Sequence, residues 1–105
     1  MNKQKILQFL GLATRARMTA TGEELVINEV RKGKAKMVIL AEDASANTNK
    51  KLHDKCKTYN VDVHVFATRY ELGHAIGKDE RVVIAITDAG FAKKLTSLFD
   101  ENNRG

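Results

Sequence analysis

The chain has 105 residues, of which 43% are apolar and 30% charged, an ordinary composition for a single globular domain with one core. No apolar run approaches the roughly eighteen residues of a membrane helix, and the N-terminus lacks the solid apolar block of an export signal, so we expect a cytoplasmic protein without a membrane partner. A single cysteine cannot form an internal disulfide. The 18 lysines and arginines against 13 acids give a net charge of +5, which favours an anionic partner, with nucleic acid first.

The first part of the chain predicts two helices and a strand. Apolar residues at helical spacing indicate a helix over 3–14. In "TGEE", Thr21 and Glu24 have the spacing of a capping box, which predicts a second helix over 22–32 that ends at Gly33. The run "KMVILA" is short, apolar and partly β-branched, which is typical of a strand buried on both faces.

The rest of the chain alternates between strands and helices. The runs "VDVHVF" and "RVVIAI" predict strands, and helices are predicted over 46–59, 69–76 and 88–100. A second capping box, "TRYE", opens the middle one of these helices, Gly77 ends it, and Asp88 caps the last. The alternation predicts an α/β fold, a three-layer α/β/α sandwich with a central, mostly parallel or mixed sheet of about four strands. Residues 1–100 would form this single domain, and 101–105 a polar tail.

The residues that could carry chemistry do not form a catalytic or metal-binding pattern. "GHAIG" lacks the lysine and the hydroxyl side chain of a phosphate-binding loop, and His53, His64 and His74 fall in three different elements without ligand spacing. Glu42 and Asp43 follow a strand, where α/β enzymes place catalytic acids, but neighbours on an extended chain point to opposite faces. A turn and the dipole of the next helix explain these two acids more simply. We therefore expect no enzyme, no cofactor, no metal and no small-molecule substrate.

The second predicted helix has an outer face of mixed chemistry. On a helical wheel its aliphatic residues face the sheet, whereas Leu25 points away from it together with Asn28 and Lys32. The start of a helix presents free N–H groups to anions such as phosphate. Arg15 and Arg17 precede this start, and "GKDER" is another basic and polar loop. If the two loops meet beside the helix start, they would cradle an RNA backbone while side chains reach base edges.

Two long stretches carry a family resemblance. "TGEELVINEVRKGKAKMVILAEDAS" and "ATRYELGHAIGKDERVVIAI" resemble the L7Ae family of kink-turn-binding ribosomal proteins. That family's pattern is a glycine-opened helix, a second glycine eleven residues on, a V-I-x-A-E-D strand end and an L-G-x-A-x-G loop. Gly22 and Gly33 have the required separation. "FLGLATRAR" and "AEDASANTNKKLHDKC" resemble the small bacterial branch of the family most closely.

The resemblance implies an α/β/α sandwich that binds RNA kink-turns, which are tight bends containing sheared G·A pairs, without catalysis. In archaeal members an Asn, a Glu and a Lys at the helix start touch those pairs, and the loop before the last strand covers a flipped-out nucleotide. The three positions fall on Glu24, Leu25 and Asn28, so this chain departs from the pattern at each. Glu24 can accept bonds from guanine but repels phosphate, Leu25 can only pack, and Asn28 brings no charge. General RNA binding is therefore favoured over strict kink-turn specificity, with affinity carried by flanking cations.

The predicted RNA surface comprises the helix start at 22–28 and the loop at 77–82. Its candidate binding residues are Arg15, Arg17, Gly22, Glu23, Glu24, Leu25, Asn28, Lys32, Lys78, Arg81 and Val82. We expect structured RNA as the partner, either ribosomal RNA or a kink-turn, together with ribosome or ribonucleoprotein components, and a monomeric protein. One alternative stays open, a protein interaction module on the same fold. It is suggested by Leu25 on the outer face and by acidic residues at the positions where the family contacts the G·A pairs.

Overall fold

The computed structural model describes residues 3–103, with the side chains of residues 3–101. The elements run in the order α1 (Lys3–Arg15), β1 (Thr19–Thr21), α2 (Glu23–Arg31), β2 (Met37–Leu40), α3 (Ala46–Thr58), β3 (Val63–Val65), α4 (Arg69–Ala75), β4 (Val83–Ile86) and α5 (Ala89–Asn103). All the predicted helices and strands are confirmed, and β1 is an addition to them. Helix α5 continues through residues 101–103 of the predicted tail, whereas residues 1, 2, 104 and 105 lie outside the described residues.

The four strands form one mixed sheet in the order β1-β4-β2-β3. Strands β2 and β3 are parallel, and β4 is antiparallel to both of its neighbours, β1 and β2. The predicted sandwich of about four strands is therefore confirmed, and of the two arrangements that the sequence left open the mixed one is present.

The lengths of the two connecting helices explain the strand directions. Helix α3 has 13 residues and extends about 20 Å, so it returns the chain across the sheet and lets β3 run parallel to β2. Helix α4 has seven residues and extends only about 10 Å. The N–H of Arg81 donates to the carbonyl oxygen of Arg69 at 3.0 Å, so the loop after α4 returns to the start of that helix. Strand β4 therefore begins at the edge where β3 ends, and it runs in the opposite direction.

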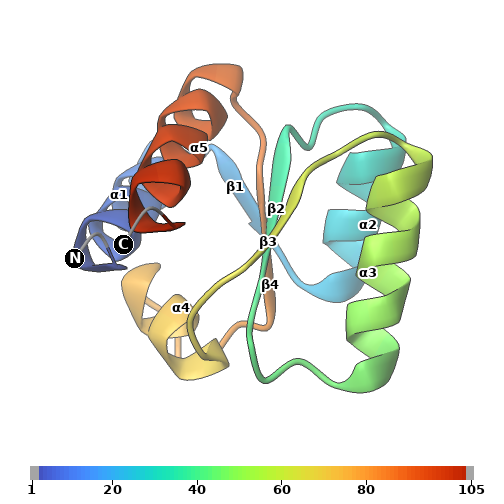
Figure 1. Cartoon of the computed structure of the whole chain (residues 1–105), viewed down its shortest axis with the longest axis horizontal. Coiled ribbons are helices and arrows are strands. Elements are labelled where there is room, and N and C mark those ends of the chain that lie inside the picture. Colours follow the sequence, from blue (N-terminus) through green and yellow to red (C-terminus); the bar gives the residue numbers. More distant parts are fainter. Residues whose placement is uncertain (1–2, 104–105) are drawn as a thin grey trace.

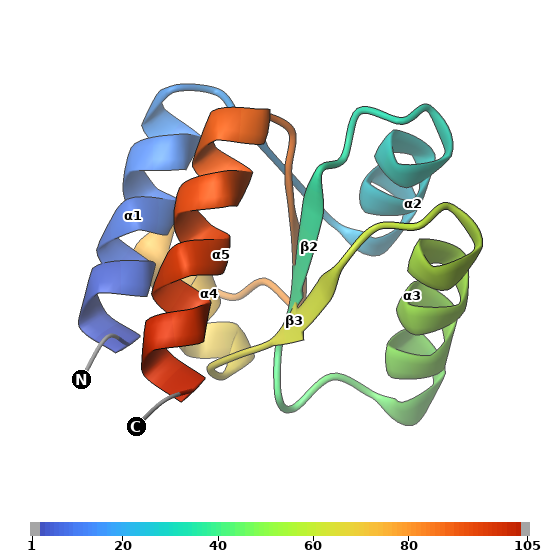
Figure 2. The ribbon, with the colours of Figure 1, turned by 45° about the horizontal axis from the view of Figure 1, so that its top comes forward.

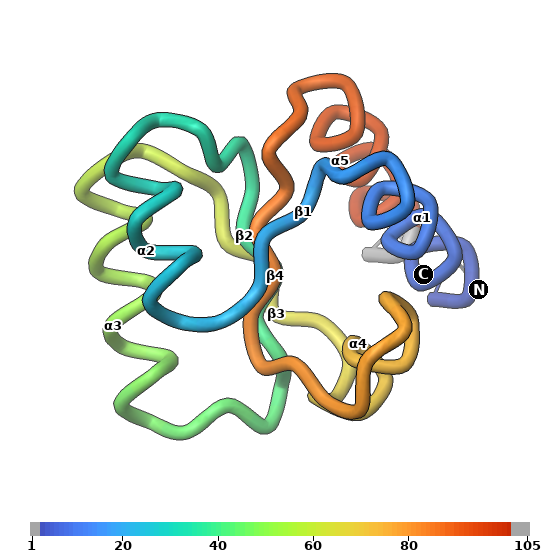
Figure 3. The backbone as a smooth tube through the Cα atoms, turned by 180° about the vertical axis from the view of Figure 1, so that it is seen from behind, coloured from blue at the N-terminus to red at the C-terminus, as the bar shows by residue number. Residues whose placement is uncertain are grey.

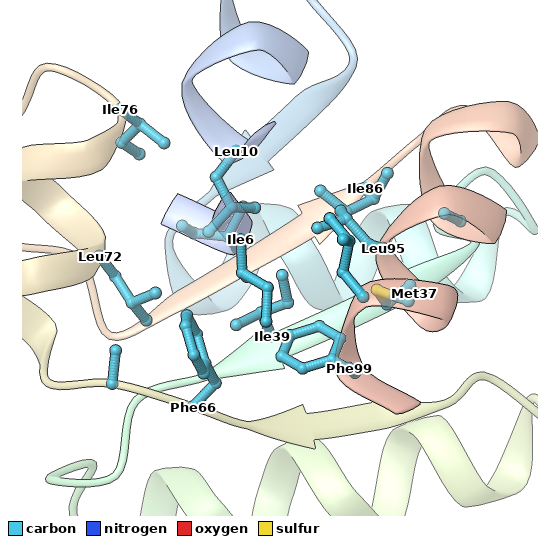
Figure 4. Close-up of a cluster of buried hydrophobic side chains, with 14 of the residues drawn as sticks. Ile6, Leu10, Met37, Ile39, Phe66, Leu72, Ile76, Ile86, Leu95 and Phe99 are labelled. Carbon is cyan, nitrogen blue, oxygen red and sulfur yellow. The ribbon is translucent and has the colours of Figure 1, made fainter. Parts of the chain in front are cut away.

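Helices α1, α4 and α5 cover one face of the sheet, and α2 and α3 cover the other (Figures 1 and 2). Every residue of β2 and β4 is buried, as the solid apolar runs predict, and alternate side chains enter the two layers. In the first layer, Ile6 of α1, Leu72 of α4 and Phe99 of α5 gather over Ile39 of β2 (Figure 4). This packing fixes the ends of the strands, and with them the loops that follow.

Most of the predicted helix ends are confirmed. The hydroxyl of Thr68 and the carboxylate of Glu71 form the expected capping box of α4, and Asp88 accepts from the N–H of Phe91 at the start of α5. Gly33 and Gly77 follow α2 and α4 with positive φ, as expected of helix stops.

The capping box predicted for Thr21 is wrong. Thr21 lies in β1, paired with Ile84, and α2 begins after Gly22 without a side-chain hydrogen bond to its first turn. The strand pairing takes Thr21 away from the capping position, because a residue in the β1–β4 ladder cannot also turn into the helix. The helix start is consequently formed by backbone alone.

No helix within residues 3–103 is long and apolar enough to cross a membrane. The same part of the chain holds no group of three or more histidine, cysteine or acidic side chains that could bind a metal ion.

Candidate nucleic-acid interface

One end of the sheet brings the start of α2 and the loop after α4 together. A cavity of about 340 Å³ lies there, lined by Gly22, Glu23, Ser45, Thr48, Arg69, Glu80, Arg81, Val82 and Val83. The backbone N–H of Gly22 points to the carbonyl oxygen of Val83 at 3.4 Å, which joins the end of β1 to the beginning of β4. Four of the candidate residues, Gly22, Glu23, Arg81 and Val82, thus line a single hollow, although they lie almost sixty positions apart in the chain.

Gly22 opens α2 in a conformation that side chains rarely adopt. Its φ is 96° and its ψ 141°, and a Cβ atom built on it would meet nothing within 4 Å. The glycine therefore serves the backbone turn, and the space beside it is open. Helices α3, α4 and α5 begin with the side-chain caps Ser45, Thr68 and Asp88, whereas α2 begins with none. The uncapped N–H groups and the positive dipole end of α2 are available to an anion.

The loop over 76–82 lies against α4 at very short range. A Cβ atom on Gly73 would come within 2.4 Å of the Cα of Glu80, so only glycine permits this approach. The N–H of Lys78 donates to the carbonyl oxygen of Gly73 at 2.8 Å, and the bond between Arg81 and Arg69 closes the far side of the loop. The result is a fixed loop, seen from behind beside α4 in Figure 3, that presents Arg81 next to the start of α2. No carboxylate within residues 3–101 forms an ion pair with Arg81.

Arg69 ties this loop to the turn after β2. Its backbone N–H donates to Oδ1 of Asp43 at 2.9 Å, its Nε to Oδ2 at 3.3 Å, and its guanidinium also reaches Oε1 of Glu80 at 3.7 Å. The turn expected at Glu42 and Asp43 is present. The helix whose start Asp43 contacts is α4, however, and not the next helix along the chain, α3, which Ser45 caps. Parallel strands β2 and β3 end at the same edge, and this places Asp43 beside the start of α4.

Glu23 faces α3. Its carboxylate accepts from Oγ1 of Thr48 at 2.8 Å and from Nζ of Lys51 at 3.1 Å. The hydrogen bond from Thr48 and then the one from Lys51 hold the pKa of Glu23 below its usual range. The side chain therefore joins the first turns of α2 and α3, and its two oxygens are already in use.

The outer face of α2 follows the helical wheel. Val26, Ile27 and Val30 are buried, whereas Leu25 is 49% exposed. The other outward residues, Glu24, Asn28 and Lys32, are also exposed. Glu24 and Asn28 face a groove between α2 and α3, and Leu25 lies on the opposite flank of the helix, beside β1.

The remaining candidates lie elsewhere. Met18 accepts at its carbonyl oxygen from the N–H of Thr87, at the far end of β4, so Arg15 and Arg17 stand at the edge opposite Gly22. Five residues of extended chain put about 16 Å between Arg17 and Gly22. Lys32 follows the last turn of α2, and Lys78 is exposed on the loop over 76–82. The expectation that the two basic loops meet beside the helix start therefore holds only in part. Arg81 of the second loop lies beside Gly22, but Arg15 and Arg17 of the first loop do not.

Sequence reasoning left out four residues that line the cavity: Ser45, Thr48, Arg69 and Val83; Glu80 was included only as part of the predicted loop at 77–82. Three of them follow the ends of β2 and β3, or cap the helices that start there. Loops at the carboxyl edge of neighbouring parallel strands lie together, so the strand assignment itself was a usable signal for Ser45, Thr48 and Arg69. Glu80 was not singled out within its loop, because its place in the cavity depends on the close approach to Gly73.

The fold and the site together define a small α/β/α sandwich with an anion-receptive end, formed by an uncapped helix start and a basic loop. Comparison with known proteins gives the family. Residues 4–96 match the model of the ribosomal protein L7Ae/L30e/S12e/Gadd45 family, and the chain belongs to that family.

Individual relatives agree with the resemblance read from the sequence motifs. The chain is 52% identical over 100 residues to the RNA-binding protein YlxQ of Bacillus subtilis (strain 168), covering 95% of this chain and 100% of that protein. It is 46% identical over 99 residues to the RNA-binding protein YlxQ of Enterococcus faecium, covering 94% and 95% of the two chains. A solved structure of a protein of unknown function from Bacillus halodurans C superimposes with a TM-score of 0.89 at 53% identity, covering 91% of this chain and 97% of that one. The expected likeness to the small bacterial branch of the family is confirmed.

Proposed function

We propose that this chain is a non-catalytic RNA-binding protein of the ribosomal type that binds kink-turns or similarly bent, structured RNA. The observation that carries the proposal is the uncapped start of α2 at Gly22, which shares one cavity with Arg81 and Val82. The proposal is also supported by the two bacterial relatives described above, both of which are named as RNA-binding proteins. Ribosomal RNA or a kink-turn in a cytoplasmic ribonucleoprotein is the partner that fits this chemistry.

The site divides the contacts into two kinds. The first N–H groups of α2 and the guanidinium of Arg81 hold phosphate oxygens, and these contacts position the RNA without reading its sequence. Glu24 and Asn28 stand on the exposed face of the first two turns, where Glu24 accepts from guanine N–H groups and Asn28 both donates and accepts. Leu25 packs against a base or sugar. Because Glu24 also repels phosphate, the affinity should depend more on the backbone contacts than on the G·A pairs.

A gel-shift titration with two RNAs of equal length tests the proposal. One carries a kink-turn, and in the other the G·A pairs are replaced by Watson–Crick pairs to give a straight duplex with the same number of phosphates. We expect tighter binding to the bent RNA, with an affinity that falls steeply with salt. Equal and weak binding to both RNAs would exclude kink-turn specificity, and no binding at low salt would exclude RNA binding altogether.

Leu25 supports a second candidate function, a protein interaction module. It is 49% exposed and lies beside Thr19, Ala20 and Glu29 in a shallow depression between α2 and β1. Purification from cells with and without nuclease separates the two functions. Partners that are lost after nuclease treatment support RNA binding. Partners that remain after nuclease treatment but no longer bind the Leu25→Ser variant support the protein interaction module.

A further inference from the structure

A groove runs between α2 and α3, on the face of the sheet opposite α1, α4 and α5 (Figures 1 and 2). The two helices run in the same direction, because Glu23 in the first turn of α2 contacts Thr48 and Lys51 in the first two turns of α3. The groove is lined by Glu24, Ile27, Asn28, Arg31, Lys51 and Lys55. Neither its floor nor its walls contain an apolar patch large enough to hold a partner by burial alone, so its chemistry is that of its charges.

Three cations converge on this groove against a single carboxylate. Arg31 approaches from the last turn of α2, and Lys51 and Lys55, one helical turn apart, approach from α3. Lys51 is engaged by Glu23, but within residues 3–101 neither Arg31 nor Lys55 has a carboxylate within ion-pair distance. Glu24, the only acid on the lining, sits at the opposite end of α2 from Arg31. The C-terminal half of the groove is therefore a strip of uncompensated positive charge.

The groove is continuous with the proposed RNA site. Glu23 and Thr48 line the cavity at the start of α2, and the groove is lined by Glu24, the residue after Glu23, and by Lys51, about one helical turn after Thr48. Lys51 bridges the two through its bond to Glu23. A nucleic-acid strand that leaves the start of α2 along this face passes from Arg81, across Lys51, to Lys55 and Arg31.

We propose that the α2–α3 groove is a second RNA contact, which holds the phosphates of one strand of a duplex stem next to the bend bound at the start of α2. The proposal rests on the proposed function, and it adds to that function a defined length of backbone. Helix α2 has nine residues and extends about 13 Å. A B-form duplex has one phosphate per about 3.4 Å of axis on each strand, and the A-form helix of RNA rises somewhat less per base pair, so the groove accommodates about four to five base pairs.

The test lengthens each stem of the bent RNA in turn. Starting from an RNA with short stems, one stem and then the other is extended by about four and about eight base pairs, and the affinity is measured as a function of salt. We expect the first extension of one stem to raise the affinity, and the second extension, as well as any extension of the other stem, to add little. The affinity gain should have a salt slope of about 2 to 3, because up to three phosphates are neutralised.

A double variant, Arg31→Gln with Lys55→Gln, removes the two unpartnered cations and leaves the Glu23–Lys51 pair in place. We expect it to bind the short RNA as the unaltered protein does and to lose the gain from the longer stem. For two contacts, the ratio of the two affinities for the long RNA should shrink about 12-fold between 50 and 200 mM salt. The matched control is Lys93→Gln with Lys94→Gln, which changes the net charge equally on exposed positions of α5, across the sheet from the groove.

The outcomes separate this proposal from the proposed function. If the unaltered protein binds no RNA, both are overturned. If it binds the short RNA but its affinity does not rise with either longer stem, only the groove contact is overturned. The groove contact is also overturned if the double variant keeps the affinity gained from the longer stem. The same conclusion follows if the control variant loses as much of that gain as the double variant does. Loss of an acidic protein partner from the double variant, with RNA binding unchanged, would assign the groove to that protein instead. Unchanged thermal unfolding of both double variants confirms that the comparison concerns folded proteins.

Discussion

Replacing Gly73 by alanine should displace the loop over 76–82 and weaken both the fold and RNA binding. The added Cβ would lie 2.4 Å from the Cα of Glu80, 2.7 Å from its nitrogen and 2.8 Å from its carbonyl carbon. Carbon atoms in contact stand about 3.5–4.0 Å apart, so the loop must withdraw by about 1.2 Å. Since all three clashing atoms belong to the backbone, no side-chain rotation can relieve the contact.

The structure sets the size of the effect. Withdrawal by that distance stretches the hydrogen bonds of Lys78 to Gly73 and of Arg81 to Arg69, now 2.8 and 3.0 Å long, and each is worth about 1 kcal/mol. Alanine recovers up to about 1 kcal/mol through its higher helix propensity. The net destabilisation should be about 1–2 kcal/mol, within the range of overpacked substitutions. Urea unfolding should show a lower midpoint with an unchanged slope.

Gly90→Ala is the matched control, because the Cβ there would meet only Oδ2 of Asp88, 3.1 Å away, and a shift of a few tenths of an ångström relieves the contact while leaving Oδ2 within reach of the N–H of Phe91. We expect its stability to stay within about 1 kcal/mol of the unaltered protein. The Gly73 variant should also bind RNA more weakly, with a salt slope lower by about 1, because Arg81 moves with the loop. A Gly73 variant with the stability and salt slope of the control would refute the assignment of the loop to the RNA site.

Three further outcomes are expected. Gly22→Ala should cost about 1–3 kcal/mol in urea unfolding through backbone strain alone, because its Cβ enters open space; a cost below about 0.5 kcal/mol would show that the φ of 96° is not required. Arg81→Ala should weaken binding to all RNAs and lower the salt slope by about 1, whereas Arg17→Ala, at the opposite edge of the sheet, should change neither; equal effects would place the RNA across both ends. Burial lowers the pKa of His64, whose Nε2 has no hydrogen-bond partner within residues 3–101 and whose ring stacks on Phe99 at 4.4 Å. The unfolded chain therefore binds the proton more readily, so the stability due to the neutral ring is full above about pH 6.5 and falls as the pH drops towards the lowered pKa. His64→Phe should remove this part of the pH dependence of the urea midpoint, and an unchanged profile would mean that another group titrates.

Periodicity predicted the elements well because each depends on local pattern. The runs that became β2 and β4 are apolar throughout, and the capping box at Thr68 needs only three neighbours. Strand β1 escaped prediction because "TAT" is too short for a pattern, and its pairing partner, β4, is more than sixty residues away. The same pairing removed Thr21 from the helix cap. Non-local contacts thus decided the points at which local rules failed.

The candidate site was predictable to a similar degree, and for the same reason. Gly22 and Arg81 stood out through the family motifs, and the structure places them in one cavity. Arg15 and Arg17 are near Gly22 in the sequence, but the extended β1 carries them to the other edge of the sheet. Arg69 lies far from Gly22 in the sequence, but the parallel pair β2–β3 brings it close. Proximity in the chain was a poor guide wherever a strand intervened.

The cations of α2 and α3 offer a physical explanation for how this chain could bind RNA although it departs from the family pattern at the start of α2. The family's lysine at the third readout position is Asn28 here, so one cation that would stand among the G·A pairs is missing. On the same side of α2, three cations line the groove towards α3. Under the two proposals together, the cations of α2 and α3 act on the backbone of the flanking stem, and Arg81 is the cation that acts at the bend. Restoring the charge by Asn28→Lys should then raise the affinity for a kink-turn by the same factor with short and with long stems, because independent contacts to the core and to the stem add in free energy. A much smaller gain with the long stem would mean that the two contacts compete for the same phosphates.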